Sequence, residues 1–217
     1  MNAGEIAVQV AQVLLHIGAV GFTPDHPVRF KSGLISPVYV DNRRLPYSPD
    51  AWQVVIDGFQ DVIEMDGITV DVIAGIEAAG IPHSAVLGYT LRKPSVFVRK
   101  QAKEHGTRSR VEGGSVAGRH VLLIEDLVTT GGSSLSGVEA LRAEGAQVDT
   151  CLAIVSYGFA QAAEAFEQAS VRLRTLTSFP VILETASREG RFHSDQRELI
   201  ERWLDDPVGW SQRLGLT

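Results

Sequence analysis

Two acidic residues, Glu125 and Asp126, stand just before a run of hydroxyl residues and glycines that extends from Thr129 to Ser133. Glycines allow the backbone amides of such a run to turn toward one point, and a following helix adds its positive N-terminal end, so the run is suited to a phosphate. Carboxylates accept hydrogen bonds from hydroxyls or bind a hard cation such as magnesium. The two groups together favour a ligand with a phosphate and vicinal hydroxyls, and a phosphorylated ribose is such a ligand.

The simpler alternative is an ordinary turn between a strand and a helix, in which Ser133 or Ser134 caps the helix and the acids are solvated. The uninterrupted order of apolar strand, Glu-Asp, two threonines and two glycines favours the ligand site over this alternative. A second candidate segment runs from Arg99 to Gly113 and is polar and basic, with little to bury. It is predicted to be a mobile loop, and positive charge on a mobile loop suits a lid over an anion.

The elements that position these residues are predicted from the spacing of apolar side chains. Residues 120–124 indicate a buried strand, and the helical spacing over 135–141 indicates a helix that Gly145 ends. A second strand at 70–74 leads into a glycine-containing loop at 75–82. In a parallel sheet the loops after both strands leave at the same edge, which is where open α/β sheets bind ligands.

The rest of the chain alternates in the same way, which predicts an α/β fold with a central, mostly parallel sheet flanked by helices. Two short strands joined by a turn are expected between Val28 and Arg43. Further strands are expected at 95–98, 148–155 and, as an edge strand, 171–176. Helices are expected at 2–17, 48–63, 161–169 and 194–203.

Composition limits the class of protein. The chain has 217 residues, of which 44% are hydrophobic and 21% are charged, as in an ordinary globular protein. Its net charge of -6 argues against nucleic acid as the main partner. No apolar run approaches a membrane span and no signal peptide is recognisable, and the single cysteine, Cys151, is expected to be a buried structural thiol. We therefore expect a cytoplasmic protein.

From Val121 to Ser134 the chain resembles the type I phosphoribosyltransferases, whose signature is a strand ending in two acids and a Thr/Gly-rich loop for the 5-phosphate of phosphoribosyl pyrophosphate. The segment from Phe30 to Arg43 is similar to the N-terminus of the orotate phosphoribosyltransferases in particular, where it forms a hood over the base. The resemblance covers nearly the whole chain. It implies a single domain over 1–217, with a helix and the hood in 1–45 and the core and C-terminal helix in 46–217.

The resemblance also implies roles for individual residues. Orotate would be bound by Lys31, Tyr39, Val40 and Thr129. Phosphoribosyl pyrophosphate would be bound by Arg99, Lys100, Lys103, His105, Glu125, Asp126, Leu127, Val128, Thr129, Thr130, Gly131, Gly132 and Ser133. The expected catalytic residues are Lys103, as a proton donor to pyrophosphate, and the two acids, which would bind ribose hydroxyls and ease a cation-like state of the sugar. Mg²⁺ is the expected cofactor, held mainly by the substrate rather than by protein side chains.

Two positions depart from the pattern of some family members. Some carry a lysine where this chain has Ala79, so pyrophosphate must be held by backbone amides or a metal instead. Some carry an arginine for the carboxylate of orotate in the segment where this chain has Ser156 to Phe159, and this chain is similar to another branch there. The sequence therefore leaves the recognition of that carboxylate open.

The resemblance further implies a homodimer in which the lid reaches the active site of the neighbouring subunit. A separate orotidine monophosphate decarboxylase is a candidate partner, while nucleic acid and membrane are not expected as partners. Two alternatives to orotate transfer stay open at this point. One is a phosphoribosyltransferase for a purine or another base, and the other is a non-catalytic regulator that binds phosphoribosyl pyrophosphate.

Overall fold

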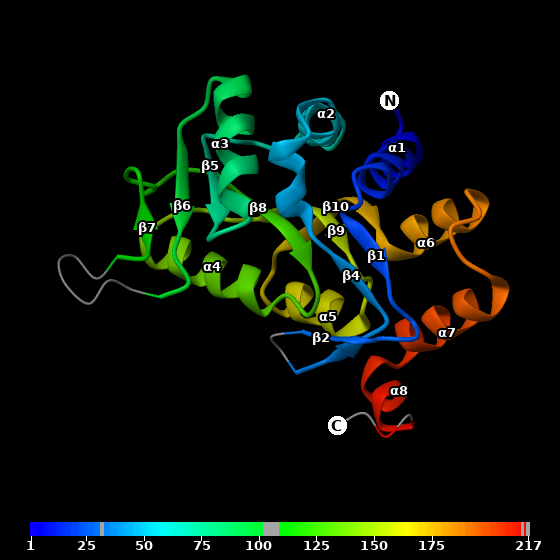
Figure 1. Cartoon of the computed structure of the whole chain (residues 1–217). Helices are drawn as coiled ribbons and strands as arrows, with labels where there is room; N and C mark the ends of the chain where they lie inside the picture. The colour runs from blue at the N-terminus through cyan, green and yellow to red at the C-terminus, as the bar shows by residue number, and fades with distance from the viewer. Residues whose placement is uncertain (31–32, 102–108, 214, 216–217) are drawn as a thin grey trace.

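A six-stranded sheet forms the centre of the computed structural model, which describes residues 1–30, 33–101, 109–213 and 215 (Figure 1). The strand order is β10-β9-β8-β5-β6-β7, and all neighbours are parallel except β6 and β7. This confirms the predicted mostly parallel sheet. The strands are β5 (Val72–Ile76), β6 (Ser95–Val98), β7 (Val111–Glu112), β8 (Val121–Val128), β9 (Thr150–Ser156) and β10 (Arg172–Ser178).

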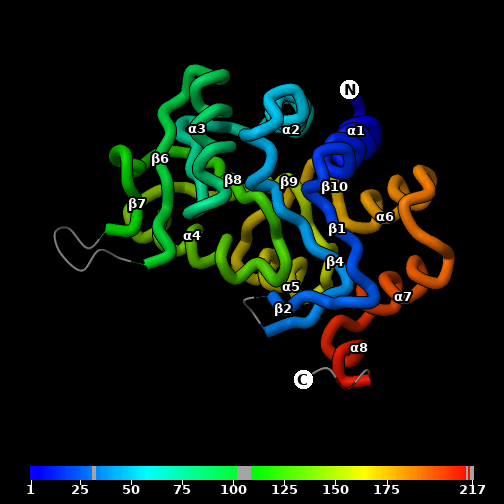
Figure 2. Tube along the Cα trace, in the orientation of Figure 1, coloured from blue at the N-terminus to red at the C-terminus, as the bar shows by residue number. Residues whose placement is uncertain are grey.

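Helices cover both faces of this sheet (Figures 1 and 2). Side chains of successive strand residues point to opposite faces, so a strand covered on both sides is apolar throughout. In β8, Leu122 and Ile124 enter the larger core, whereas Val121 and Leu123 enter the smaller one. The larger core is covered by α1 (Ala3–His16), α2 (Pro49–Met65), α3 (Gly80–Leu91) and α6 (Phe179–Arg188), and the smaller by α4 (Gly132–Ala143) and α5 (Ala160–Gln168).

The predicted hood consists of two small antiparallel pairs near the N-terminus. β1 (Val20–Phe22) pairs with β4 (Val38–Val40), and β2 (Val28–Arg29) pairs with β3 (Ile35–Ser36). The 3-10 helix η1 (Asn42–Tyr47) then leads into α2. The last two helices, α7 (Ser194–Asp205) and α8 (Pro207–Arg213), lie beside the hood on the side away from α2 (Figure 1).

Trp203 joins the C-terminal helices to the hood. Its side chain is fully buried, and its indole N–H donates to the carbonyl of Ile35 in β3 at 2.8 Å. The ring also makes edge contacts with Tyr157 and Phe159, with centroids 5.5 Å and 5.6 Å away. One residue of α7 thus packs against both the hood and the end of β9.

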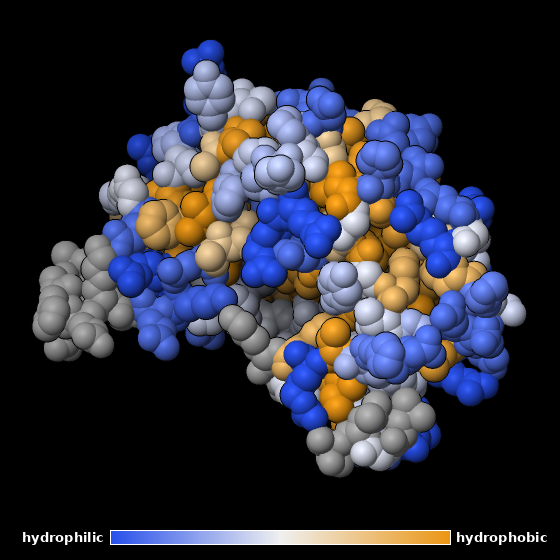
Figure 3. Space-filling model, viewed as in Figure 1, coloured by the Kyte–Doolittle hydropathy of each residue, from blue (hydrophilic) through white to orange (hydrophobic). Residues whose placement is uncertain are grey.

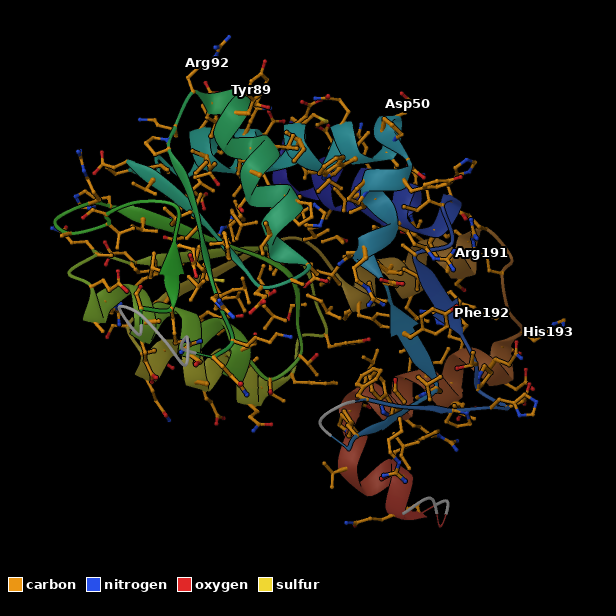
Figure 4. All side chains as sticks on the ribbon, turned by 60° about the vertical axis from the view of Figure 1, so that its left-hand side comes forward. Asp50, Tyr89, Arg92, Arg191, Phe192 and His193 are labelled. Carbon is orange, nitrogen blue, oxygen red and sulfur yellow. The ribbon has the colours of Figure 1, made fainter. Side chains whose placement is uncertain are left out.

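The connection from α6 to α7 is also held against the body of the protein. Arg191 donates to the carbonyl of Leu15 at 3.1 Å, and Phe192 packs edge-on against Phe22 of the hood at 4.9 Å. Figure 4 shows His193, the next residue, extending outward from this connection. No helix in the described part of the chain combines the length and apolar character needed to cross a membrane.

Several boundaries differ from those predicted. β8 extends to Val128, so Glu125 and Asp126 lie within the strand and not after it. The helices α3, α6 and α8, the 3-10 helix η1 and the strands β1 and β7 were not predicted. The strands and η1 are too short to give a clear periodicity. Ser48 makes no side-chain cap at α2, whereas Asn2 and Glu5 form a reciprocal capping box at the start of α1. Cys151 is buried, as expected.

We expect Trp203→Ala to lower the free energy of unfolding by about 3 to 5 kcal/mol, because it leaves a cavity and an unpaired carbonyl at Ile35. Urea unfolding at one protein concentration would measure this. Tyr47→Ala, at a side chain that is 93% exposed, is the control and should change the value by less than about 0.5 kcal/mol. Equal losses in the two variants would contradict the proposed attachment.

Candidate active site

The parallel pairing of β5 with β8 brings the two predicted loops together. Gly75 in β5 stands opposite Ile124 in β8, so both strands end at the same edge of the sheet. A cavity of about 480 Å³ opens at this edge, beneath the hood. Its wall includes six of the residues predicted from the acidic and Thr/Gly-rich segment, namely Glu125, Asp126, Leu127, Thr129, Thr130 and Ser133.

Glu125 points to the α4 side of the sheet, on the same side as Val121 and Leu123. Only 4% of its surface is exposed. Its carboxylate accepts a hydrogen bond from the hydroxyl of Ser134 at 3.1 Å and another from the backbone N–H of Asp126 at 3.2 Å. Ser134 therefore holds Glu125 and does not cap α4, whose first turn has no side-chain cap.

Asp126 is fixed from the opposite side, by the 3-10 helix η1 that follows the hood. The fully buried Asn42 donates its side-chain N–H to the backbone carbonyl of Asp126 at 2.7 Å, across 84 positions of sequence. The next residue, Arg43, forms an ion pair with Asp41 at 2.6 Å. In the view of Figure 3, hydrophilic side chains gather over η1, where this pair lies. Sequence reasoning missed Asn42, because a contact between distant segments leaves no local signal.

The two acids influence each other's protonation. Burial and, next in size, the charge of Asp126 together raise the pKa of Glu125 to about 8. Burial also raises the pKa of Asp126, although the charge of Arg43 opposes that rise. Neighbouring carboxyl groups that are both shielded from water do not easily ionise together, so Glu125 keeps its proton to a higher pH than an isolated glutamate would.

The Thr/Gly-rich loop turns at Gly131 into the start of α4. Gly131 has φ of 84°, and a Cβ there would lie 2.9 Å from the ring of Phe166, so only glycine fits without strain. α4 starts at the next residue, and within the described chain no side chain caps its first turn. The amides at this positive helix end are available to a phosphate.

The second loop, after β5, packs tightly on β8. A Cβ at Gly75 would meet the carbonyl of Gly80 at 2.7 Å, and a Cβ at Gly80 would meet the carbonyl of Ile124 at 2.7 Å. Glu77, which sequence reasoning did not single out, accepts a hydrogen bond from the backbone N–H of Lys100 at 2.9 Å. Ala79, at the position where some family members carry a lysine, lines the cavity.

An aromatic wall closes the cavity on the hood side. Phe30 from the hood and Tyr157 after β9 both line it, with their ring centroids 5.9 Å apart. Tyr157 is stacked on Phe159 at 5.5 Å, with their planes within 10°. Tyr157 is only 2% exposed, so it supports Phe30 from behind, and the half-buried Phe30 is the ring that a flat ligand can contact.

The predicted residues are not all found at the cavity. Val40 and Lys100 line it, but Tyr39 is not among the lining residues, because alternation along β4 turns its ring toward Gly21 instead. Arg99 lines a neighbouring hollow. Val128, Gly131 and Gly132 support the loop without lining the cavity. Lys31, Lys103 and His105 lie outside the described residues.

We expect the stability of the protein to report the raised pKa of Glu125. The unfolded chain releases this proton near the ordinary value of 4.5, but the folded protein keeps it until about pH 8. The stabilisation is therefore present below about 4.5 and is lost as the pH rises to about 8. Relative to Glu125→Gln, the wild-type free energy of unfolding should fall across this range by at most about 1.4 kcal/mol per pH unit.

Chemical unfolding at pH 5, 6, 7 and 8 would measure this difference. Glu64→Gln, at an exposed site on α2, serves as the control. A difference between wild type and Glu125→Gln that stays constant over the whole range would contradict the raised pKa.

Comparison with known proteins places this architecture in one family. Residues 47–180 match the model of the phosphoribosyl transferase domain. The chain is 39% identical over 207 residues to an orotate phosphoribosyltransferase of Cutibacterium acnes, covering 95% of this chain and 96% of the relative. It is also 39% identical over 204 residues to one of Listeria monocytogenes, covering 94% of this chain and 98% of the relative.

Solved structures agree. The crystal structure of orotate phosphoribosyltransferase from Aeropyrum pernix superposes with a TM-score of 0.74 at 34% identity, covering 85% of this chain and 99% of that one. UMP synthase of Leishmania donovani shares the fold, with a TM-score of 0.76 at 24% identity; the match covers 92% of this chain and 42% of that longer chain. These matches extend over nearly the full length of the chain, which belongs to the phosphoribosyltransferase family, among the orotate phosphoribosyltransferases.

Proposed function

We propose that this protein transfers the ribosyl phosphate of phosphoribosyl pyrophosphate to orotate, giving orotidine 5-monophosphate and pyrophosphate. The observation that carries the proposal is the convergence, at one edge of the sheet, of a helix N-terminus without a side-chain cap, the buried Glu125 and the half-buried Asp126, beneath the hood. The choice of orotate as the base rests on the name that the relatives share. The choice of a sugar phosphate as the other substrate rests on the residues that line the cavity.

The phosphate loop fixes one end of the substrate. Backbone amides from Thr130 to Ser133 and the hydroxyls of Thr129 and Thr130 bind the 5-phosphate at the start of α4. Glu125 and Asp126 lie beside this loop and bind the ribose hydroxyls. Because Glu125 keeps its proton near neutral pH, it donates a hydrogen bond to the ribose while the charge of Asp126 faces the sugar.

Breaking the bond to pyrophosphate makes the ribose carbon cation-like and lets a ring nitrogen of orotate attack it. A negative charge held close to that carbon in a cavity with little water stabilises this state more than it stabilises the ground state. Lys100, which lines the same cavity, faces the departing pyrophosphate. Lys103 and His105 also bind the pyrophosphate in this proposal, and Lys103 donates a proton to it. Lys31 binds an anionic group of the base or the phosphate.

We expect magnesium to bind at this site together with the substrate. Among the described residues no group of three or more His, Cys, Asp or Glu side chains could hold the ion alone. Pyrophosphate and ribose oxygens would supply most of its ligands, and Glu125 and Asp126 would lie close to it. When bound, the ion draws charge toward the leaving group and so favours bond cleavage.

We further propose a homodimer in which the segment containing Lys103 and His105 serves the active site of the neighbouring subunit. A cytoplasmic location and a separate decarboxylase that consumes the product complete the proposal. Each active site would then need the acids of one subunit and the basic segment of the other.

Orotate should be consumed only when phosphoribosyl pyrophosphate and Mg²⁺ are both present, as followed by the loss of orotate absorbance. Asp126→Asn should lower kcat by about 100-fold or more, because it removes the charge that stabilises the cation-like sugar. Asp50→Asn carries the same change at the exposed start of α2 (Figure 4) and should leave kcat unchanged. Consumption of a purine in place of orotate would replace the assigned base, and binding without turnover would indicate a regulator.

Shared sites predict complementation between two inactive variants. Lys103→Ala and Asp126→Ala should each have little activity alone, whereas mixing them under conditions that exchange subunits should restore about a quarter of wild-type activity. Half of randomly mixed dimers are hybrids, and each hybrid has one intact site of two. Absence of recovery despite subunit exchange, monitored by mass spectrometry, would count against shared sites, and normal turnover by Lys103→Ala would remove the basic segment from the mechanism.

A further inference from the structure

Arg110 connects the end of β6, the start of β7 and the first turns of α4, whose relative positions matter for the proposed reaction. It stands just before β7, which pairs antiparallel with β6. Its backbone carbonyl accepts from the N–H of Arg99 at 2.8 Å, and its side-chain Nε donates back to the carbonyl of Arg99 at 2.7 Å. The main chain at the end of β6 is therefore held to Arg110 by two hydrogen bonds in opposite directions.

The same guanidinium reaches the helix that follows the phosphate loop. Its Nη1 donates to the carbonyl of Ser136 at 3.0 Å and to the hydroxyl of Ser136 at 2.9 Å. Ser136 lies in the first turns of α4, three residues after Ser133 of the phosphate loop. The neighbouring Ser109 donates to the carboxylate of Glu144 at the far end of α4, so this part of the chain is attached to the helix at two points.

The place of these contacts relates them to substrate binding. Lys100 follows Arg99 and lines the catalytic cavity, and Ser133 lines it on the side of the phosphate loop. Both also line a hollow of about 330 Å³ whose wall includes Arg99, Arg110 and Ser136. Arg110 thus bridges the two walls that would face the pyrophosphate end and the 5-phosphate end of one substrate.

The partners of Arg110 are neutral oxygens. Within the described residues no carboxylate lies within ion-pair distance of its guanidinium, so its contacts fix geometry and do not neutralise its charge. A planar guanidinium can donate along several fixed directions at once, whereas the ammonium of lysine is a compact point charge. The arrangement therefore requires the shape of arginine and not only its charge.

We infer that Arg110 is a positioning residue for the proposed reaction, which sets the separation between Lys100 at the end of β6 and the phosphate loop at the start of α4. The inference rests on the proposed function and goes beyond it, because Arg110 acts through other residues. A substrate held at both ends is sensitive to this separation, since a small misplacement weakens both contacts together. The binding of orotate, which we place against Phe30, does not depend on this separation.

The test compares Arg110→Met, Arg110→Lys and Ser136→Ala with the wild type. For both Arg110 variants we expect the KM for phosphoribosyl pyrophosphate to rise about tenfold, as for the loss of hydrogen bonds to a charged group, while the KM for orotate changes less than about twofold. Ser136→Ala, which removes only the hydroxyl acceptor, should give a smaller rise in the same parameter. Arg92→Met, at the outer end of α3 where the side chain extends away from the protein (Figure 4), is the matched control and should behave as wild type.

Calorimetric titration with phosphoribosyl pyrophosphate and Mg²⁺, without orotate, separates this inference from the proposed function. If the wild type binds but does not consume orotate, the proposed function fails, while weaker binding by the Arg110 variants still supports the inference. Full recovery in Arg110→Lys would overturn it, because charge alone would then suffice. An equal rise of both KM values, or unchanged binding in all three variants, would overturn it as well.

Discussion

The parallel pairing of β5 with β8 is the constraint on which the rest of this structure depends. It brings two loops from different parts of the chain to one edge of the sheet, where the helix that follows each of them begins. Gly75 and Gly80 permit the close approach, since a side chain at either position would collide with a backbone carbonyl. Without that contact the phosphate loop and the second loop would each exist, but no cavity would lie between them.

The same edge holds two acids that are costly to bury. An ionised carboxylate removed from water is unfavourable unless it is paired, so the protein keeps a proton on the pair and surrounds it with donors. Ser134 on α4 holds Glu125 from one side of the sheet, and Asn42 in η1 holds the backbone of Asp126 from the other. The acids are thus fixed by elements on opposite faces, which gives the site a rigid geometry before any ligand arrives.

The peripheral elements act through a few specific attachments. Trp203 fastens the C-terminal helices to β3, so the hood that covers the cavity is supported from outside the sheet. Arg110 makes a comparable connection at the other end of the site, between β6 and α4. Both are single side chains that join segments far apart in sequence, which explains how short strands such as β2, β3 and β7 hold their places.

Local sequence determined a large part of this protein. The apolar runs predicted the parallel sheet, and they predicted the strand, loop and helix around Glu125 and Asp126, because these signals lie within a few consecutive residues. The tertiary structure alone decided that Glu125 faces Ser134, that Asn42 reaches Asp126, that Tyr39 turns toward Gly21 and that Arg110 binds α4. Such contacts depend on which faces of distant elements meet, and no spacing along the chain records that choice. For the same reason the raised pKa of Glu125 could not be predicted from sequence, since it arises from burial that only the packed molecule creates.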